Sequence, residues 1–297
     1  MQSSTTFQPP LFKQNDLNRV VNVASVPLRS PFRYPGGKTW LIPRIRQWLL
    51  SKPVKPQLLI EPFAGGAIVG LTAAFESLAK QIILVERDPC VAAVWKTILG
   101  GDGEWLAKRI VEFDLTTRSV DAIVESEADT TRDLAFQTIL RNRVNRGGIL
   151  AEGAGRVKHG ENGKGLASRW YPETLLKRIL EIAQIRDRLT FVEGDGIQIM
   201  RENAARDDAA FFIDPPYTAA GKRAGSRLYA YSELDHTELF SVAATVRGDF
   251  LMTYDNAPEI EAMARQHSFD RESVAMKNTH HTQMTELLIG PNLAWLR

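Results

Sequence analysis

The sequence predicts an α/β protein with a doubly wound, mixed β-sheet and a small helical and loop region inserted into it. The short apolar runs at 58–60 and 82–85 are typical of buried strands, and each precedes a helical pattern, at 68–78 and 89–99. This strand–helix–strand–helix order is typical of a parallel sheet with crossover helices. The basic, glycine-rich stretch 141–169 interrupts that order and predicts the insertion.

The other elements follow from the same patterns along the chain. Apolar residues recur at helical spacing over 41–49, 102–140 and 172–188. Apolar runs predict strands at 189–192, 209–213 and 250–253, and a late hairpin pairs 273–276 with 287–289. We therefore expect a flexible arm at 1–28, one α/β domain made of 29–100 and 186–297, and the inserted region at 101–185.

The composition excludes several classes of protein. With 37 Lys and Arg against 35 Asp and Glu, and 44% hydrophobic residues, the 297-residue chain resembles an ordinary soluble globular protein. The single cysteine, Cys90, cannot form an intramolecular disulfide, which favours a reducing cytoplasm. The sequence has neither an apolar run near the ~18 residues of a membrane span nor a secretory signal, so we expect no membrane partner. His280 and His281 have no partner at metal-ligand spacing, so we expect no metal.

The basic stretch 141–169 predicts contact with nucleic acid. It carries seven basic residues and two acidic ones, although the net charge of the whole chain is only +2. Arginine binds phosphate and guanine, and asparagine binds adenine, so an Asn- and Arg-rich loop suits DNA. The residues that we assign to DNA are Arg141, Asn142, Arg143, Asn145, Arg146, Arg156 and Lys158. The alternative is a solvated surface insertion without a ligand.

The turn at 61–67 predicts a nucleoside ligand. Glycines after the first strand let a ligand approach the backbone, and Glu86, at the end of the next strand, is placed to bind both hydroxyls of a ribose. The fingerprint G-x-G-x-x-G is absent, which argues against a nicotinamide or flavin cofactor, whereas S-adenosylmethionine fits. Gly37 and Lys38 do not belong to a phosphate-binding P-loop, because Phe32 stands where its first glycine would be. An ordinary strand-to-helix turn is the alternative.

Asp214-Pro215-Pro216-Tyr217 is the most specific motif and follows the apolar strand at 209–213 directly. The two prolines have no N–H and fix the backbone, so the Pro215 carbonyl projects rigidly beyond the strand. Asp214 supplies a second acceptor, and Tyr217 a flat ring on which a base can stack. Two acceptors beside such a ring suit the exocyclic amine of a planar base.

In this order, the motifs resemble those of the Dam-like DNA adenine methyltransferases, over about residues 32–288. Phe32–Lys38 is similar to the N-terminal element of the family, Glu61–Gly66 to its cofactor loop, and Val85–Asp88 to its acidic strand end. The resemblance implies that S-adenosylmethionine is bound by Tyr34, Gly37, Lys38, Glu61, Pro62, Phe63, Gly65, Gly66, Glu86, Arg87, Asp195 and Gly196. Ala67 and Ile68 depart from the family, which usually has a further glycine there, and we expect this to affect affinity only.

The resemblance implies transfer of a methyl group from S-adenosylmethionine to N6 of adenine in a specific sequence of double-stranded DNA, by base flipping. Catalysis would then rest on Asp214, Pro215, Pro216 and Tyr217, and the inserted region would recognise the target. We expect a monomer, and a cognate restriction endonuclease is one candidate partner. The alternatives are a cytosine-N4, RNA or protein-amide methyltransferase, and a catalytically silent DNA-binding module. Asp rather than Ser at position 214 favours adenine by the same resemblance.

Overall fold

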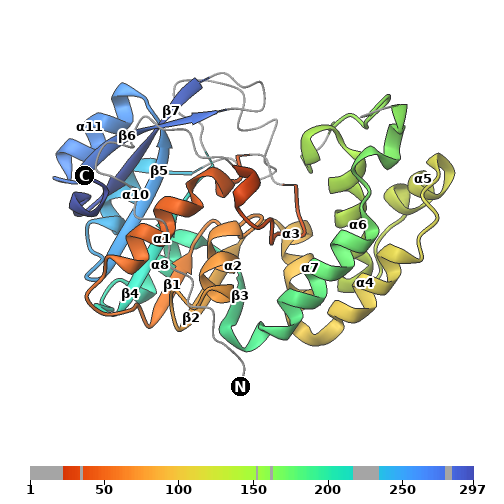
Figure 1. Cartoon of the computed structure of the whole chain (residues 1–297), viewed down its shortest axis with the longest axis horizontal. Coiled ribbons are helices and arrows are strands. Elements are labelled where there is room, and N and C mark those ends of the chain that lie inside the picture. Colours follow the sequence, from red (N-terminus) through yellow and green to blue (C-terminus); the bar gives the residue numbers. More distant parts are fainter. Residues whose placement is uncertain (1–22, 34–35, 152, 161–162, 217–233, 278–282) are drawn as a thin grey trace.

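A computed structural model describes residues 23–33, 36–151, 153–160, 163–216, 234–277 and 283–297. Seven strands form one sheet in the order β3-β2-β1-β4-β5-β7-β6 (Figure 1). Their bounds are β1 Leu58–Glu61, β2 Gln81–Glu86, β3 Leu189–Glu193, β4 Ala209–Ile213, β5 Asp249–Asp255, β6 Asp270–Lys277 and β7 Gln283–Gly290. The predicted doubly wound, mixed sheet is confirmed.

The strand order changes direction beside β1. From β1 the chain moves outward to β2 and β3, and it then returns to β4 on the other side of β1, with all these pairs parallel. β5 continues the parallel part, whereas β7 runs antiparallel between β5 and β6. In open parallel sheets, ligands bind beyond the carboxyl ends of the strands at such a reversal. The topology therefore directs attention to the ends of β1, β2 and β4.

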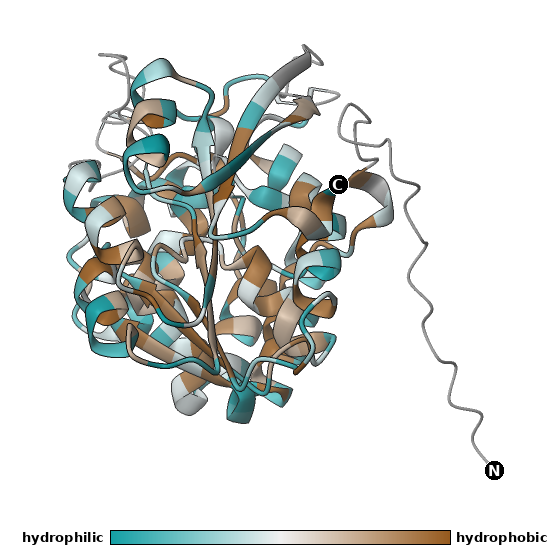
Figure 2. Cartoon of the chain, turned by 90° about the vertical axis from the view of Figure 1, so that its left-hand side faces the viewer, coloured by the Kyte–Doolittle hydropathy of each residue, from teal (hydrophilic) through white to brown (hydrophobic). Residues whose placement is uncertain are grey.

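Helices cover both faces of the sheet. On one side lie α1 (Ile42–Leu50), α2 (Ile68–Phe75) and α3 (Pro89–Thr97), and on the other lie α8 (Gly196–Asn203), α10 (His236–Ala243) and α11 (Pro258–Gln266). Side chains of β4 alternate between the two apolar cores: Phe212 belongs to the first, and Phe211 and Ile213 to the second. Because both faces are covered, the central strand β4 is apolar and buried throughout. The hydropathy colouring shows apolar ribbon in the middle of the molecule (Figure 2).

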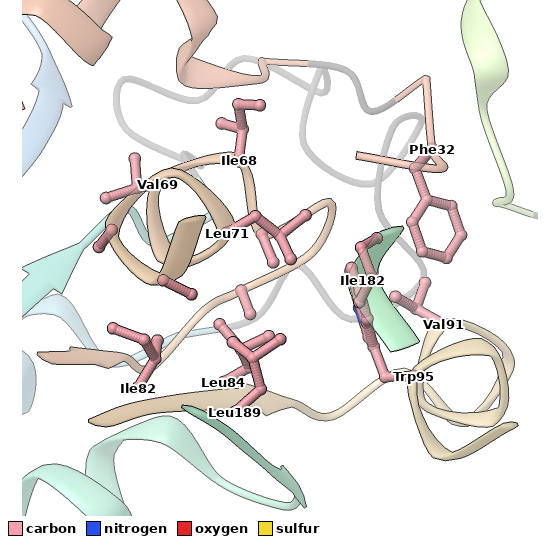
Figure 3. Close-up of a cluster of buried hydrophobic side chains, with 14 of the residues drawn as sticks. Phe32, Ile68, Val69, Leu71, Ile82, Leu84, Val91, Trp95, Ile182 and Leu189 are labelled. Atoms are coloured by element: carbon pink, nitrogen blue, oxygen red, sulfur yellow. The ribbon is translucent and has the colours of Figure 1, made fainter. Parts of the chain in front are cut away.

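Four helices form the inserted unit beside α3 and β3. They are α4 (Gly103–Val111), α5 (Thr117–Glu125), α6 (Thr131–Val144) and α7 (Pro172–Gln184) (Figure 1). α6 packs on α3, and α7 packs on α4. Ile182 of α7 lies near Val91 and Trp95 of α3, so the insertion shares the core of the α/β unit (Figure 3). The domain boundaries at 100/101 and 185/186 stay predictions.

Several local predictions are wrong in their bounds. α6 continues to Val144, so the start of the expected basic loop is helical instead. The pattern at 102–140 divides into three helices, and α8, α10 and α11 were not predicted. Of the expected arm, 1–22 lies outside the described residues, and Val26 is packed at 4% exposure. No helix in the described part of the chain has the length and apolar character to span a bilayer.

Candidate active site

A cavity of about 440 Å³ lies at the carboxyl ends of β1, β2 and β4. The glycine turn after β1, Glu86 at the end of β2, Asp195 before α8, and the Asp214-Pro215-Pro216 corner after β4 all line it. The first strand turn and the proline corner therefore open on the same space. Ligand cavities in proteins commonly measure about 300–1,000 Å³, so this one is large enough for a nucleoside with a side chain.

The Asp214 carboxylate is held in place by two neighbours. Its Oδ1 atom accepts a hydrogen bond from Thr253 Oγ1 at 2.8 Å and forms an ion pair with Lys38 Nζ, also at 2.8 Å. The Asp214 side chain keeps 21% of its surface exposed, whereas Lys38 is 4% exposed. The carboxylate is therefore fixed from behind while one side faces the cavity. Tyr217, the fourth residue of the motif, lies outside the described residues.

Lys38 lies between two carboxylates rather than in an open cofactor site. Its Nζ atom is 2.8 Å from Asp214 and 3.1 Å from Glu286 of β7, and it also donates to the Gly36 carbonyl at 3.1 Å. Burial alone would lower the pKa of Lys38, but the two carboxylates outweigh it and raise the pKa above its ordinary value. Lys38 is therefore a charged support for Asp214. Since Lys38 also lines the cavity, its assignment to the cofactor stays a prediction.

Glu61 supports the glycine turn from below. It is 3% exposed, and its Oε2 atom accepts a hydrogen bond from the Gly70 amide at 2.7 Å, in the first turn of α2. Burial raises the pKa of Glu61 to about 8. A Cβ atom on Gly70 would lie 2.6 Å from that carboxylate and 2.5 Å from Leu84, so only glycine fits. Ala67 adopts a left-handed conformation with φ of 51°, where glycine is the usual residue.

Glu86 joins the ends of β1 and β2. Its carboxylate accepts from the Gly65 amide at 2.9 Å and from the amides of Arg87 and Asp88 at 2.8 and 2.9 Å. Burial raises the pKa of Glu86 to about 7 despite these donors. The carboxylate faces the cavity at the position where an acid can accept from the hydroxyls of a ribose.

Asp195 and Gly196 begin α8 at the cavity wall. Asp195 Oδ1 caps the helix by accepting from the amides of Ile197 and Gln198, at 2.8 and 3.1 Å. A Cβ atom on Gly196 would lie 2.2 Å from the Pro62 carbonyl oxygen, so glycine lets α8 approach the turn after β1. Pro62, Phe63, Gly66, Gly37 and Arg87 also line the cavity, whereas Tyr34 lies outside the described residues.

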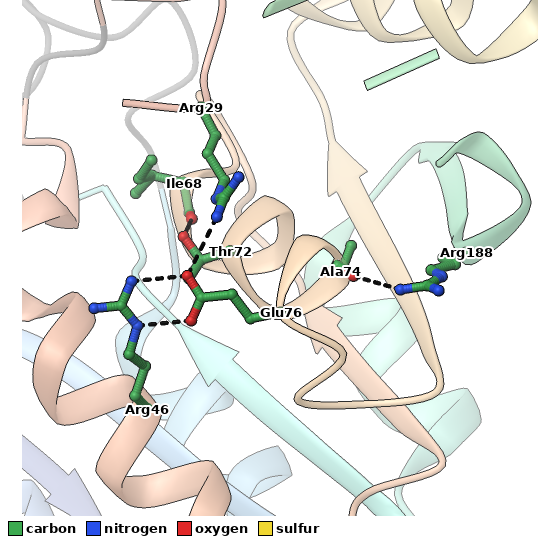
Figure 4. Close-up of polar contacts among 7 residues, drawn as sticks. All are labelled: Arg29, Arg46, Ile68, Thr72, Ala74, Glu76 and Arg188. Atoms are coloured by element: carbon green, nitrogen blue, oxygen red, sulfur yellow. Dashed lines mark hydrogen bonds and ion pairs between the residues drawn. The ribbon is translucent and has the colours of Figure 1, made fainter. Parts of the chain in front are cut away.

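The segment before Lys38 is fastened to the α/β unit. Arg29 donates to Glu76, at the end of α2, with 3.3 Å between the atoms, and Arg46 of α1 binds the same carboxylate through two contacts of 2.7 Å (Figure 4). The ring of Phe32 packs against that of Trp95, with 5.8 Å between centroids (Figure 3). The wall that this segment contributes to the cavity is thereby fixed.

The insertion holds the same segment through residues that were assigned to DNA. Asn142 is fully buried: its amide accepts from the Arg33 N–H at 2.8 Å and donates to the carbonyls of Arg33 and Gly148 at 2.9 and 2.7 Å. Arg143 is 3% exposed and donates to the Pro31 carbonyl. Asn145 is 9% exposed and donates to the Ile149 carbonyl at 2.8 Å. These backbone hydrogen bonds contradict the prediction that Asn142 and Asn145 bind DNA, and Arg143 is too buried to contact a duplex.

The other predicted DNA residues differ among themselves. Arg146 and Lys158 are exposed, although Arg146 Nε also donates to the Arg156 carbonyl at 3.2 Å. Arg156 forms an ion pair with Asp121 of α5, and Arg141 donates to the Val124 carbonyl at 2.9 Å. Arg146 and Lys158 are thus the members of the group that present their charge to solvent.

Four contributors to the site were missed from the sequence, and one of them is Arg33, at the cavity wall. Thr253 and Glu286 lie in the apolar strands β5 and β7, and Arg178 lies on the amphipathic helix α7. A buried acid beside the run Leu287-Leu288-Ile289 was the available signal for Glu286. Thr253 and Arg178 gave none, since each fits an ordinary strand or helix surface. Among the residues that the structure describes, no group of three His, Cys, Asp or Glu side chains could hold a metal ion.

Neither a family model nor a curated protein matches this chain. Solved structures do match. The rRNA methyltransferase aviRa from Streptomyces viridochromogenes is 14% identical, with 89% of this chain and 88% of that chain covered and a TM-score of 0.40. A precorrin-6y C5,15-methyltransferase from Geobacter metallireducens GS-15 is 11% identical, with coverages of 83% and 84% and a TM-score of 0.35. These likenesses are weak, and the fold assignment rests on the strand order of this chain itself.

Proposed function

We propose that this chain is an S-adenosylmethionine-dependent methyltransferase that modifies N6 of adenine in a specific sequence of double-stranded DNA, as the Dam-like enzymes do. One observation carries the proposal: the Asp214-Pro215 corner and the glycine turn with Glu86 open on the same cavity. An amine acceptor and a nucleoside site that share one space are what a direct methyl transfer requires.

The described residues fit the methyl donor. Glu86, at the end of β2, offers a carboxylate for the ribose, and Asp195 follows the neighbouring strand β3. The backbone turn at 61–67 leaves room for a ligand that has no phosphate groups. The carboxylate of Asp214, which lines this wall, suits a cationic sulfonium. When bound, S-adenosylmethionine supplies an activated methyl group on a good leaving group, so the protein needs chiefly to position the acceptor.

Asp214 and Pro215 would position that acceptor. The amino lone pair of adenine is delocalised into the ring, and hydrogen bonds from its two N–H groups to Asp214 and the Pro215 carbonyl localise electron density on nitrogen. Asp214 and Pro215 would thereby hold N6 ready to attack the methyl carbon that bound S-adenosylmethionine would supply with loss of its carbon–sulfur bond, and the proton that N6 gives up would pass to water. Thr253 and Lys38 hold the Asp214 carboxylate in one orientation throughout.

The target base must leave the duplex to reach a cavity of this depth. Base flipping costs a few kcal/mol, which contacts to the flanking strand offset. Arg146 and Lys158 are the exposed basic residues of the insertion that we propose for phosphate contacts. Contacts of this kind weaken steeply with salt and carry little sequence information, so the residues that read the sequence are a separate set.

The test is transfer of labelled methyl groups from S-adenosylmethionine to plasmid DNA, with structured RNA as a second acceptor. We expect the label on N6-methyladenine from DNA, and sequencing of the product gives the recognition site. The Asp214→Asn variant should lose about 100-fold or more in rate, as removal of one aligned polar contact does elsewhere, while its affinity for S-adenosylmethionine changes little. Label on cytosine or on RNA would show that adenine in DNA is not the substrate. Binding of S-adenosylmethionine without any methyl transfer would indicate a catalytically silent DNA-binding module.

A further inference from the structure

The cavity has a second wall, formed where the insertion meets the N-terminal segment, and this wall is basic. Arg33 belongs to the N-terminal segment at 30–33, Arg143 lies in the last turn of α6, and Arg178 lies in the middle of α7. All three line the same cavity as Glu86 and Asp214. Residues from three distant parts of the sequence therefore bring guanidinium groups to one place.

Within the described chain, none of these three arginines forms an ion pair with a carboxylate. Glu181 of α7 acts on Arg178 from a greater distance, and burial outweighs it in lowering the pKa of Arg178. Arg143 Nε and Arg33 Nη1 are buried and have no hydrogen-bond partner there. Burial, together with the neighbouring charges of Arg178 and Arg33, lowers the pKa of Arg143 to about 9. Burying like charges with unused donors is costly unless an anion joins them.

The backbone fixes two of the groups in advance. Arg143 donates to the Pro31 carbonyl, and Arg178 Nη1 donates to the Ser30 carbonyl at 3.0 Å. Each guanidinium has five N–H donors in a planar fork, so these contacts orient the group and leave donors for a ligand. A site with this preorganisation binds a carboxylate or phosphate with two parallel hydrogen bonds.

We infer that Arg33, Arg143 and Arg178 form an anion site that binds the carboxylate at the amino-acid end of S-adenosylmethionine. The inference rests on the proposed function. Two anions could bind here, the carboxylate of S-adenosylmethionine and a phosphate of DNA, and the burial of Arg143 decides between them. Arg143 is only 3% exposed, so a bulky duplex backbone cannot reach it, whereas the end of a small ligand inside the cavity can. The acidic wall then takes the ribose and sulfonium, and the basic wall takes the carboxylate.

Calorimetry with two ligands tests this assignment. Decarboxylated S-adenosylmethionine keeps the nucleoside and the sulfonium but lacks the carboxylate. The wild-type protein should prefer S-adenosylmethionine by about 10–100-fold, the range expected for a charged hydrogen-bonded pair. In Arg178→Met and Arg33→Met the preference should fall below about threefold, and Arg178→Lys should restore part of it. Lys177→Met, an exposed change on the same helix, should keep the full preference.

The opposite outcomes are distinct. Equal binding of both ligands by the wild type, or an unchanged preference in Arg178→Met, overturns the carboxylate site. Duplex DNA measured by fluorescence anisotropy forms the second arm: a loss of DNA affinity in Arg178→Met with the ligand preference intact would assign the arginines to phosphate instead. If neither small ligand binds the wild type, the proposed function itself fails. Arg143 is left unsubstituted because its contacts hold the fold together.

Discussion

The two walls of the cavity solve the problem of buried charge differently. On the sheet wall, Glu61 and Glu86 accept hydrogen bonds from backbone amides, and Asp214 has Lys38 and Thr253. On the insertion wall, Arg33 and Arg143 keep buried donors without partners in the described chain. The sheet wall is therefore complete by itself, whereas the insertion wall leaves donors for a ligand. We therefore expect substitutions on the insertion wall to change the affinity for anions, and substitutions on the sheet wall to change the folding stability.

Protonation of Glu61 should give the largest effect. Its pKa of about 8 lies above that of an unfolded chain, so the native state holds the extra proton between about pH 4.5 and 8 and loses stability as the pH rises through that window. At ~1.4 kcal/mol per pKa unit, the loss is on the order of 5 kcal/mol. Urea unfolding of the wild type at pH 5 and pH 8.5 measures it.

Glu61→Gln should remove the share of that pH dependence that belongs to Glu61, because a neutral amide oxygen can still accept from Gly70. Glu86, with a pKa of about 7, should keep its own smaller share. The exposed Glu259→Gln on α11 should keep the wild-type slope. If the unfolding free energy of Glu61→Gln depended on pH as it does in the wild type, the raised pKa of Glu61 would not contribute to stability and the prediction would be contradicted.

Removal of the Lys38 cation should come next. Lys38→Met leaves the Asp214 and Glu286 carboxylates facing each other without a counter-charge, and loss of one partner of a buried ion pair costs about 3 kcal/mol or more. We expect a lower unfolding midpoint in urea and slower methyl transfer. The double variant Lys38→Met/Glu286→Gln should recover much of the stability, and absence of any recovery would contradict the pairing.

Asn142→Ala tests the seam between the walls and should cost about 2 kcal/mol, since it leaves the buried Arg33 and Gly148 backbone groups without their partner. Thermal unfolding measures this loss. Lys158→Ala, an exposed change in the same region, should instead leave stability unchanged and weaken DNA binding at low salt. If Asn142→Ala were fully stable and altered the methylated sequence, the base-reading interpretation would return.

The smallest effect should come from Ala67→Gly. Glycine relieves a left-handed conformation that costs alanine about 1 kcal/mol, but it also removes a buried methyl worth about 0.8 kcal/mol. The unfolding free energy should change by less than about 1 kcal/mol. Ala64→Gly, at a neighbouring buried position without a positive φ, also loses a buried methyl and relieves no strain. It should therefore destabilise the protein by about 0.8 kcal/mol or more.

The sequence predicted the sheet well because its strands are continuous apolar runs. β1 and β4 are buried on both faces, and such runs need no partner to be recognised. The helices α10 and α11 were not predicted, although α2 with eight residues was, so length is not the reason. Their place on the sheet is decided by tertiary packing. The mistaken assignment of Asn142 has the same origin: an Asn among arginines suggests a nucleic-acid contact, and only the fold shows the backbone groups around it.

The site was predictable where one short motif contains the chemistry. Asp214-Pro215 and Glu86 each follow a strand directly, so the strand ends alone bring them together. The support of Asp214 by Lys38, Thr253 and Glu286 joins residues up to 248 positions apart in the chain, and the pairing of strands β5 and β7 creates it. No local pattern contains that information.

The attachment of the segment at 30–33 to α6 and α7 has a consequence for how the molecule assembles. Arg33 meets Asn142 across 109 positions, and Ser30 meets Arg178 across 148. Loops of this length close slowly, because chain entropy must be lost before any contact forms. During synthesis the segment at 30–33 therefore completes its contacts only after α7 has left the ribosome. The cavity is then formed late, after β1 and β2 have paired.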